Sequence, residues 1–315
     1  MGFPLGKDIT WGSHQGPLVV EVPDYQVIEC VPCGFKHVVP LPSEEELLSY
    51  YETQFYQTSK PDYLTKASDE QDWLNIGYDT KLEMLWPSDR PRDEAQTRQS
   101  RPRILDVGSG PGFFLKRAAE QGWDAVGLEP SPQALNFSRD LGLNVIRGSL
   151  GRGPLPDMGR FDAIHLQHVL EHVPEPAYVL SILKSLLAHG GRICVEVPND
   201  FSITQEILFL NMGFKPWWVA PPEHLNYFSF DSLEALLRRE GWHVAYRTTT
   251  FPIDFALLAG LNYVSNSRIG QTVHKLIATC ESSFSRAGKA DSIKRLYWSI
   301  ADCHLGREVV LVAHP

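Results

Sequence analysis

Three glycines and one carboxylate have the spacing of a nucleoside-binding site. Gly108, Gly110 and Gly112 follow the apolar run Ile104–Val107. Because glycine has no Cβ, a glycine turn at the carboxyl end of a strand lets the backbone approach a ligand closely. Glu129 ends the next apolar run, 21 residues after Gly108, where a carboxylate can accept hydrogen bonds from both hydroxyls of a ribose. Together these residues predict a site for a nucleoside.

The position of the third glycine indicates which nucleoside. A dinucleotide fingerprint needs a glycine three residues after Gly110, but Phe113 stands there and Gly112 comes one residue early. With Asp106 ahead of it, this pattern resembles motif I of class I S-adenosylmethionine-dependent methyltransferases, especially small-molecule enzymes of the ubiquinone-biosynthesis type. Three later segments resemble the same family: Phe161–Val173, Leu187–Asn199 and Pro222–Ser229. The resemblance covers about residues 103–250 and the final predicted strand.

This resemblance implies that S-adenosyl-L-methionine is the methyl donor and S-adenosyl-L-homocysteine the product. It assigns the cofactor contacts to the glycine turn and to the ends of the next strands, namely Asp106, Gly108, Ser109, Gly110, Gly112, Glu129, Pro130, Ser149, Leu150 and Gln167. The family often has an acidic residue near the adenine after the third strand. Here Gly148-Ser-Leu150 stands in its place, so Ser149 or a backbone amide would contact the adenine. Asp106 could also act structurally, by capping the glycine turn.

Transfer to an oxygen or carbon acceptor requires a base that removes a proton. His224 is the first candidate, because histidine titrates near neutral pH and the adjacent Glu223 can hold its tautomer. A Glu–His pair also lies in the active site of the sugar C-methyltransferases that this chain resembles. The alternative is that the pair caps the helix expected to begin near Phe230. His168 is a further catalytic candidate, expected near the methionine end of the cofactor.

The predicted acceptor site combines aromatic and polar side chains near the later strand ends: Trp217, Trp218, Tyr227, His172 and Asn199. Aromatic rings could stack on a sugar or an aromatic acceptor, although the same rings could be ordinary core. His165 lies in the middle of a predicted strand and is expected to be a packed core histidine. Glu196, also mid-strand, is expected to face a neighbouring helix.

Cys30 and Cys33 form one C-x-x-C pair. The pair resembles half of the N-terminal zinc module of some sugar C-methyltransferases. A structural zinc ion needs four ligands, usually two such pairs, and the sequence has no second pair. His14 and His37 could contribute, but their spacing matches no common pattern. We therefore predict a metal-free remnant and no metal, and the remnant favours sugars or glycosylated metabolites as acceptors.

Apolar runs alternate with helical periodicity from Arg103 onward, which predicts an α/β fold. We expect a doubly wound, seven-stranded, Rossmann-like methyltransferase sheet with a small N-terminal cap and a helical insert before the last strand. The predicted organisation is a cap region at 1–86, β-rich at first and then helical, a flexible linker at 87–102, the S-adenosylmethionine-binding methyltransferase domain at 103–250 and 306–315, and the insert at 251–305. The insert would be a substrate lid or a homodimer contact.

The composition limits the classes of partner. The chain has 315 residues, 43% of them apolar and 21% charged, and a net charge of −9, so a nucleic-acid substrate is not expected. No apolar run reaches the roughly 18–20 residues of a membrane span, and residues 1–9 lack the apolar core of a secretory signal. Five cysteines do not make a disulfide framework, which favours a reducing cytoplasm.

The sequence thus predicts a methyltransferase that acts on a small molecule. A hydroxyl of a sugar, glycan or secondary metabolite is slightly favoured over carbon, with a sugar C-methyltransferase as the alternative. Two alternatives come from other classes. One is an NAD(P)-dependent oxidoreductase built on the same kind of sheet. The other is a non-catalytic scaffold that binds S-adenosylmethionine, against which the intact glycine turn and Glu129 argue.

Overall fold

The computed structural model describes residues 3–43, 45–47, 50, 70–87, 101–151 and 156–315. Most of the predicted linker, residues 88–100, lies outside this part of the chain. A helix is also expected from Ser43, a good N-cap with Glu46 three residues later, and it is described only at residues 45–47 and 50. There the Glu46 carboxylate accepts hydrogen bonds from the backbone N–H of Ser43, at 2.7 Å, and from its hydroxyl, at 2.8 Å. Two residues of that predicted helix, Leu48 and Tyr51, are outside the described residues.

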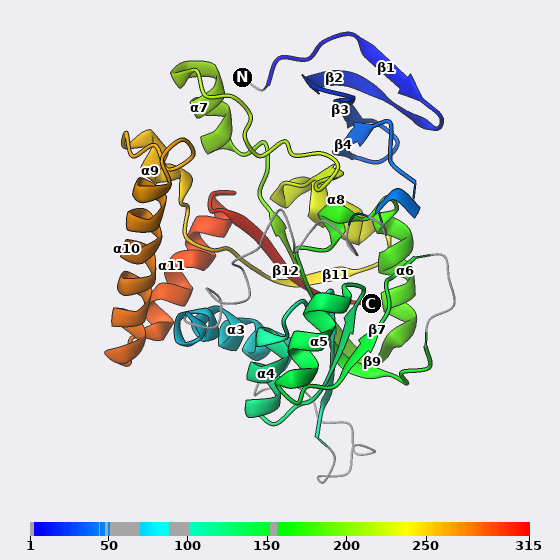
Figure 1. Ribbon diagram of the computed structural model, residues 1–315, viewed down its shortest axis with the longest axis vertical. Helices are drawn as coiled ribbons and strands as arrows, with labels where there is room; N and C mark the ends of the chain where they lie inside the picture. The colour runs from blue at the N-terminus through cyan, green and yellow to red at the C-terminus, as the bar shows by residue number, and fades with distance from the viewer. Residues whose placement is uncertain (1–2, 44, 48–49, 51–69, 88–100, 152–155) are drawn as a thin grey trace.

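A seven-stranded sheet forms the centre of the molecule (Figure 1). Its strands, in spatial order, are β11 (His243–Thr248), β12 (Glu308–His314), β9 (Leu187–Pro198), β8 (Phe161–Gln167), β5 (Arg103–Val107), β6 (Asp124–Glu129) and β7 (Val145–Arg147). The five strands from β9 to β7 are parallel. The last strand, β12, pairs antiparallel with both β9 and β11. The seven-stranded α/β prediction is confirmed.

Helices cover both faces of this sheet, as an alternating strand and helix pattern requires. The bounds are α3 (Gln71–Leu85), α4 (Phe113–Glu120), α5 (Pro132–Asp140), α6 (Pro176–Leu186) and α8 (Phe230–Arg239). Leucines of α6 and α8 pack into one buried cluster with the strands. Aromatic and aliphatic side chains of α3 and α4 pack into a second. Helix α3 was predicted within the N-terminal region, and the structure packs it against the seven-stranded sheet.

The first forty residues form a separate small sheet. It consists of β1 (Asp8–Trp11), β2 (His14–Val22), β3 (Tyr25–Cys30) and β4 (Phe35–Val39), with the two-residue strand β10 (Asn226–Tyr227) beside β4. All of its pairings are antiparallel. Strand β10 belongs to the loop before α8. The small sheet therefore pairs with a segment that begins at Asn226, almost 190 residues after β4 ends at Val39.

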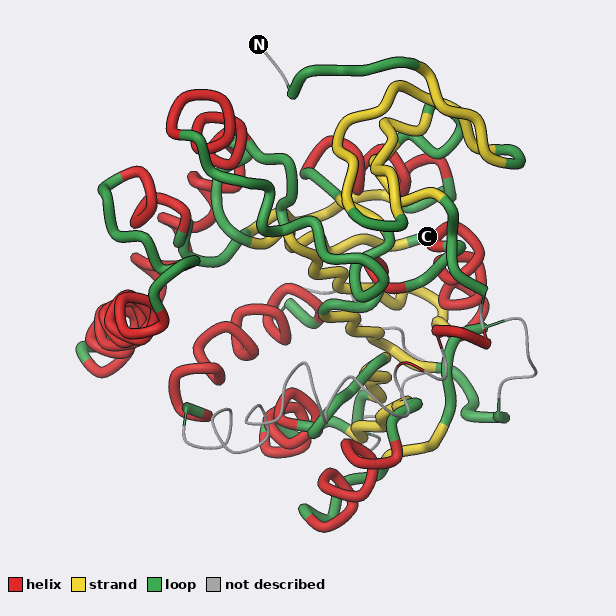
Figure 2. Tube along the Cα trace, turned by 45° about the horizontal axis from the view of Figure 1, so that its top comes forward, coloured by secondary structure: helices red, strands yellow, loops and turns green. Residues whose placement is uncertain are grey.

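Four further helices lie after β9. These are α7 (Ile203–Met212), α9 (Asp254–Leu258), α10 (Ser267–Arg286) and α11 (Ala290–Asp302). The last three confirm that residues 251–305 are largely helical. Helices α10 and α11 pack side by side against α3 and the edge strand β11 (Figures 1 and 2). Among the described residues no helix combines the length and apolarity needed to cross a membrane.

Candidate functional site

The glycine turn between β5 and α4 is fixed by contacts with the ends of neighbouring strands. The backbone N–H of Gly108 donates to the carbonyl of Leu128 at 2.8 Å. Gly108 has a φ of +65°, and a Cβ there would lie 2.8 Å from a Val169 methyl carbon. A side chain would therefore be strained by both the backbone and the packing. The turn brings bare backbone to the carboxyl edge of the sheet.

Glu129, at the end of β6, faces this turn. Its carboxylate accepts hydrogen bonds from the backbone N–H groups of Gly110 and Ser131, both at 2.8 Å. The residue is 4% exposed. Burial raises the pKa of Glu129 to about 7, despite the opposing effect of the two N–H donors. The glycine turn thus holds the Glu129 carboxylate in place. The same turn and carboxylate were predicted to bind one ligand together.

Asp106 is turned toward the sheet interior. Its carboxylate lies 2.7 Å from Nδ1 of His165 on the adjacent strand β8. The His165 ring stacks on Phe114 with centroids 3.7 Å apart, which confirms His165 as a buried core residue. Burial raises the pKa of Asp106 to about 8. The described contacts of Asp106 therefore match its structural interpretation, beside the cofactor role that the resemblance implies.

A cavity of about 170 Å³ lies at this edge of the sheet. Five predicted cofactor residues line it: Gly108, Glu129, Pro130, Ser149 and Leu150. A second cavity of about 170 Å³ adjoins it and shares Pro130, Ser149 and Leu150. The sequence reasoning missed Val169 and Val173, which line the first cavity, because apolar residues in a loop carry no motif. We call these two spaces the donor cavities.

The other predicted cofactor residues do not line the first donor cavity. Gly110 contributes through its N–H to Glu129, and Gly112 is the N-cap of α4. The hydroxyl of Ser109 is buried with no hydrogen-bond partner among the described residues. Gln167 lines a different space, described next.

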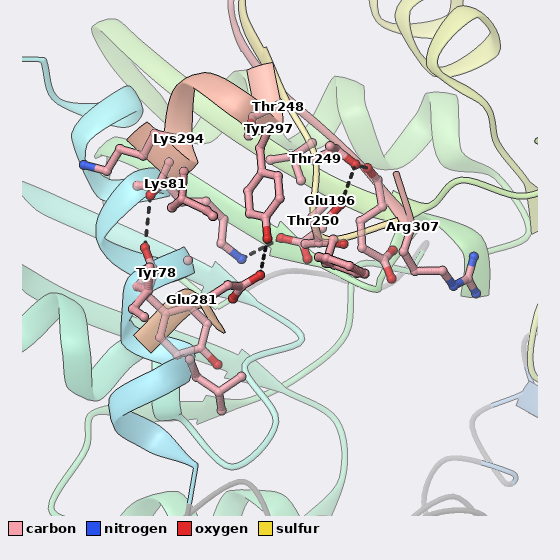
Figure 3. A pocket seen from close by; sticks show the side chains of 18 of the residues that line it. Tyr78, Lys81, Glu196, Thr248, Thr249, Thr250, Glu281, Lys294, Tyr297 and Arg307 are labelled. Atoms are coloured by element: carbon pink, nitrogen blue, oxygen red, sulfur yellow. Dashed lines mark hydrogen bonds and ion pairs between the residues drawn. The ribbon is translucent and has the colours of Figure 1, made fainter. Parts of the chain in front are cut away.

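A larger cavity, of about 310 Å³, lies between α3, the α10–α11 pair and the ends of the central strands (Figure 3). We call it the acceptor cavity. Its polar and charged lining comes from seven helices and strands and the loop before β12, and it includes Lys81, Gln167, Glu196, Thr248, Glu281, Lys294, Tyr297, Arg307 and Glu308. Trp73, Tyr78 and Phe251 add aromatic surface. A volume above about 300 Å³ is within the range of small-molecule sites.

An ion pair crosses the floor of the acceptor cavity. The Lys81 ammonium lies 2.6 Å from the Glu196 carboxylate, and the two side chains are 7% and 4% exposed. Lys81 also donates to Gln167 at 3.1 Å. The expectation that Glu196 faces a neighbouring helix is confirmed, since Lys81 belongs to α3. Lys81 itself was missed, because a lysine 115 residues away in sequence gives no local signal of its partner.

His168 borders both the donor and the acceptor cavity. It follows β8 with a φ of +55°, an uncommon backbone conformation for a residue with a Cβ. Its Nδ1 lies 3.1 Å from the Glu171 carboxylate. Burial lowers the pKa of His168, but the nearby carboxylates, above all Glu308 and Glu171, outweigh this effect and raise the pKa to about 9.

The Glu223–His224 pair lies elsewhere. Neither residue lines the donor cavities or the acceptor cavity. The His224 ring packs edge-on against His172, with centroids 5.0 Å apart. Burial, reinforced by His172, lowers the pKa of His224 to about 3. The backbone carbonyl of Glu223 accepts a hydrogen bond from His172 Nδ1 at 2.5 Å, so this contact involves the main chain of Glu223.

None of the five residues predicted to bind the acceptor lines the acceptor cavity. Trp218 and Tyr227 are 3% and 2% exposed and pack with Trp217 in the core beneath the N-terminal sheet. Asn199 donates to the backbone carbonyls of His304 and Gly306. His172 lines both donor cavities. The aromatic cluster therefore matches its alternative interpretation as ordinary core.

Comparison with known proteins shows which family the chain resembles. A family model described as a methyltransferase domain matches residues 70–246. A ubiquinone biosynthesis O-methyltransferase of Xylella fastidiosa is 33% identical over 107 residues, which are 31% of this chain and 42% of that protein. The corresponding enzyme of Methylococcus capsulatus is 32% identical over 112 residues, 34% of this chain and 47% of that protein. The chain thus spans less than half the length of these relatives.

A solved structure of a SAM-dependent methyltransferase from Archaeoglobus fulgidus also aligns with the chain. It has 15% sequence identity and a TM-score of 0.46, and it covers 77% of this chain and 93% of its own.

Proposed function

The chain belongs to the methyltransferase-domain family, and from this premise we propose that it methylates a hydroxyl of a small molecule held in the acceptor cavity. The resemblance to class I S-adenosylmethionine-dependent methyltransferases is confirmed by the same match. S-Adenosylmethionine is the methyl donor. One observation carries the proposal: His168 borders both the donor and the acceptor cavity. Methyl transfer requires two bound reactants that meet at one point.

The residues around the donor cavities fit this cofactor. Glu129 is held by two backbone N–H groups and retains further lone pairs for ribose hydroxyls. The buried Ser109 hydroxyl, which has no partner in the part of the chain that the structure describes, adds a polar group to the same turn. Ser149 and Leu150 extend the lining from the first donor cavity to the second. When bound, the cofactor supplies a methyl group already activated by its sulfonium.

We assign the general base to His168. The residue lies between the two spaces, and Glu171 orients its ring through Nδ1. This arrangement leaves Nε2 to take the proton from an acceptor hydroxyl. His224, the first choice from sequence, is a weaker candidate, because it lines neither the donor nor the acceptor cavity.

The lining of the acceptor cavity favours a polar small molecule. Lys81 and three carboxylates line it, and threonines add hydroxyls. Such a lining suits a sugar, a glycan or a hydroxylated secondary metabolite. The curated relatives are O-methyltransferases, which supports oxygen as the methylated atom. The α10–α11 pair supplies Glu281 and Tyr297 to the wall, so we propose that the insert at 251–305 acts as the substrate lid.

Calorimetry and a transfer assay test the proposal. The protein should bind S-adenosylmethionine, and Glu129→Ala should weaken binding roughly tenfold or more, since hydrogen bonds to a charged group contribute about 1.5–3 kcal/mol each. Glu120→Ala, an exposed change on α4, is the matched control. Labelled donor and a panel of hydroxylated metabolites would then identify the acceptor. Absence of S-adenosylmethionine binding, or preferential binding of NAD, would refute the proposal.

A further inference from the structure

Four potential metal ligands converge in the N-terminal sheet, away from the donor and acceptor cavities. They are His14 at the start of β2, Cys30 at the end of β3, Cys33 in the turn that follows, and His37 on β4. One ligand atom from each lies within 4.8 Å of all the others. We propose that these side chains bind one zinc ion, which fixes the N-terminal sheet.

Two separations between the ligand atoms match those of a tetrahedral zinc site. His14 Nδ1 lies 3.7 Å from the Cys30 sulfur and 3.4 Å from the Cys33 sulfur. Zinc bonds of about 2.3 Å to sulfur and 2.1 Å to nitrogen, at tetrahedral angles, place these atoms about 3.6 Å apart. A single imidazole nitrogen has either one proton or one lone pair, so it cannot form good hydrogen bonds with both thiols. A shared ion accounts for both contacts.

His37 is oriented as a metal ligand. Its Nδ1 lies 2.8 Å from the backbone carbonyl of Val38. Because a carbonyl only accepts, Nδ1 carries the proton and Nε2 has the free lone pair. That Nε2 is buried with no hydrogen-bond partner among the described residues. A backbone carbonyl that fixes the tautomer of a ligating histidine is a regular feature of metal sites.

The backbone explains how these residues meet. The N–H of Gly34 donates to the carbonyl of Cys30 at 2.9 Å, and Gly34 has a φ of +77°. This turn places Cys30 and Cys33 close together. The N–H of Val31 bonds to the carbonyl of Gln15 at 2.8 Å, which brings the start of β2 alongside. His14 therefore arrives through strand pairing, so its spacing in the sequence matches no common zinc pattern.

The donor set indicates the metal. Two thiolates and two imidazoles in a tetrahedral arrangement favour zinc over magnesium, calcium or manganese. Cys30 and His37 are each 1% exposed, whereas His14 and Cys33 are partly exposed and border a surface cavity through which an ion can enter. With four protein ligands no position remains for a substrate, so the role is structural.

The site also connects the small sheet to the catalytic fold. The Arg239 guanidinium, at the end of α8, donates to the carbonyl of Cys33 at 2.8 Å. An ion bound to Cys33 would therefore hold the turn in the conformation that Arg239 recognises. We expect loss of the ion to loosen the N-terminal sheet and to leave the glycine turn and Glu129 in place.

Metal analysis of the purified full chain tests the inference. Mass spectrometry of the elements should find about one zinc ion per chain, as in other closed structural sites. Cys33→Ser should lower the zinc content by at least about tenfold. Cys303→Ser, a change at an exposed cysteine after α11, should retain the ion. Replacement of zinc by cobalt should give the intense visible bands of a tetrahedral site and the sulfur-to-cobalt charge-transfer band.

Two results would overturn the inference. One is wild-type protein that binds S-adenosylmethionine yet retains no zinc after incubation with zinc chloride and gel filtration. The other is a cobalt spectrum without tetrahedral or sulfur bands, which decides the question even where Cys33→Ser does not fold. Donor binding is measured on the same samples. A failure of the zinc inference is therefore distinguishable from a failure of the proposed methyltransferase function.

Discussion

At the scale of single residues, the surroundings of His168 decide its charge. This residue is held in a left-handed backbone conformation and faces Glu171 and Glu308. Because these carboxylates raise its pKa to about 9, the imidazole is largely a cation at neutral pH. A base must first lose that proton. The activity of the enzyme should therefore report the titration of His168.

We predict that kcat/KM for methyl transfer rises about tenfold per pH unit between roughly pH 7 and pH 9, because only neutral His168 can accept a proton. His168→Asn should lower the rate by about 10²–10⁴-fold and abolish this rise. Its affinity for S-adenosylmethionine should change little. His243→Asn, an exposed change at the far end of β11, is the control. A variant that keeps both the rate and the pH profile would exclude His168 as the base.

Residues whose partners are local in sequence were predicted best. The glycine turn and Glu129 are about 20 residues apart, and their β–α context is visible in the apolar pattern, so five of the ten predicted cofactor residues line the first donor cavity. His14, Lys81 and Glu308 gave no comparable signal. Their partners lie on strands and helices far away in the chain, and only the pairing of those elements brings them together.

At the scale of elements, α3 is attached to the sheet by the Lys81–Glu196 ion pair. Burial raises the pKa of Glu196, but Lys81 and His168 outweigh this effect and lower it. Lys81→Met should lower the free energy of unfolding by about 3–5 kcal/mol, because it leaves a buried carboxylate without its partner. Lys116→Met, which removes an exposed pair on α4, should cost less than about 1 kcal/mol. Urea unfolding measures both.

The pH dependence of this difference has a definite sign. A carboxyl whose pKa is lowered in the folded state contributes stability above its unfolded pKa of about 4.3. That contribution is lost as the pH falls through the folded pKa. The advantage of the wild type over Lys81→Met should therefore shrink below about pH 4. The double variant with Glu196→Gln should recover most of the loss at neutral pH, and no recovery would mean that Lys81 acts through packing alone.

Helices and strands were predictable where the apolar periodicity was strong. They were less predictable where tertiary contacts decide whether an element forms or in which direction it runs. The apolar runs Tyr25–Cys30, Ile104–Val107, Ala125–Leu128 and Phe161–Leu166 predict strands, and the structure forms these strands as β3, β5, β6 and β8 to within about two residues at each end. Helix α7 was not predicted, although Ser202 and Gln205 form its capping box. The antiparallel direction of β12 was also missed, because a strand has the same apolar pattern in either direction.

At the scale of the whole molecule, the proposed function assigns the two reactants to two different groups of elements. The first donor cavity is formed by the ends of β5 and β6 and the loops after β5, β6, β7 and β8. The acceptor cavity lies between the sheet, α3 and the α10–α11 pair (Figure 3). Changes in the insert should therefore affect the acceptor and spare the donor. Because of this separation, the proposed lid at residues 251–305 can be tested whether or not His168 is the general base.

Glu281 on α10 is the residue to change for that test. Its carboxylate accepts hydrogen bonds from Trp73 on α3, at 2.6 Å, and from Tyr297 on α11. Glu281→Ala should raise KM for the acceptor roughly tenfold or more, because it removes the bond that ties α10 to α3 over the acceptor cavity, and a hydrogen bond to a charged group contributes about 1.5–3 kcal/mol to the closed arrangement. The Kd of S-adenosylmethionine should stay within about twofold. Asp291→Ala, a change at an exposed carboxylate of α11, should alter neither constant. Equal weakening of donor and acceptor by Glu281→Ala would instead show that the insert stabilises the whole fold.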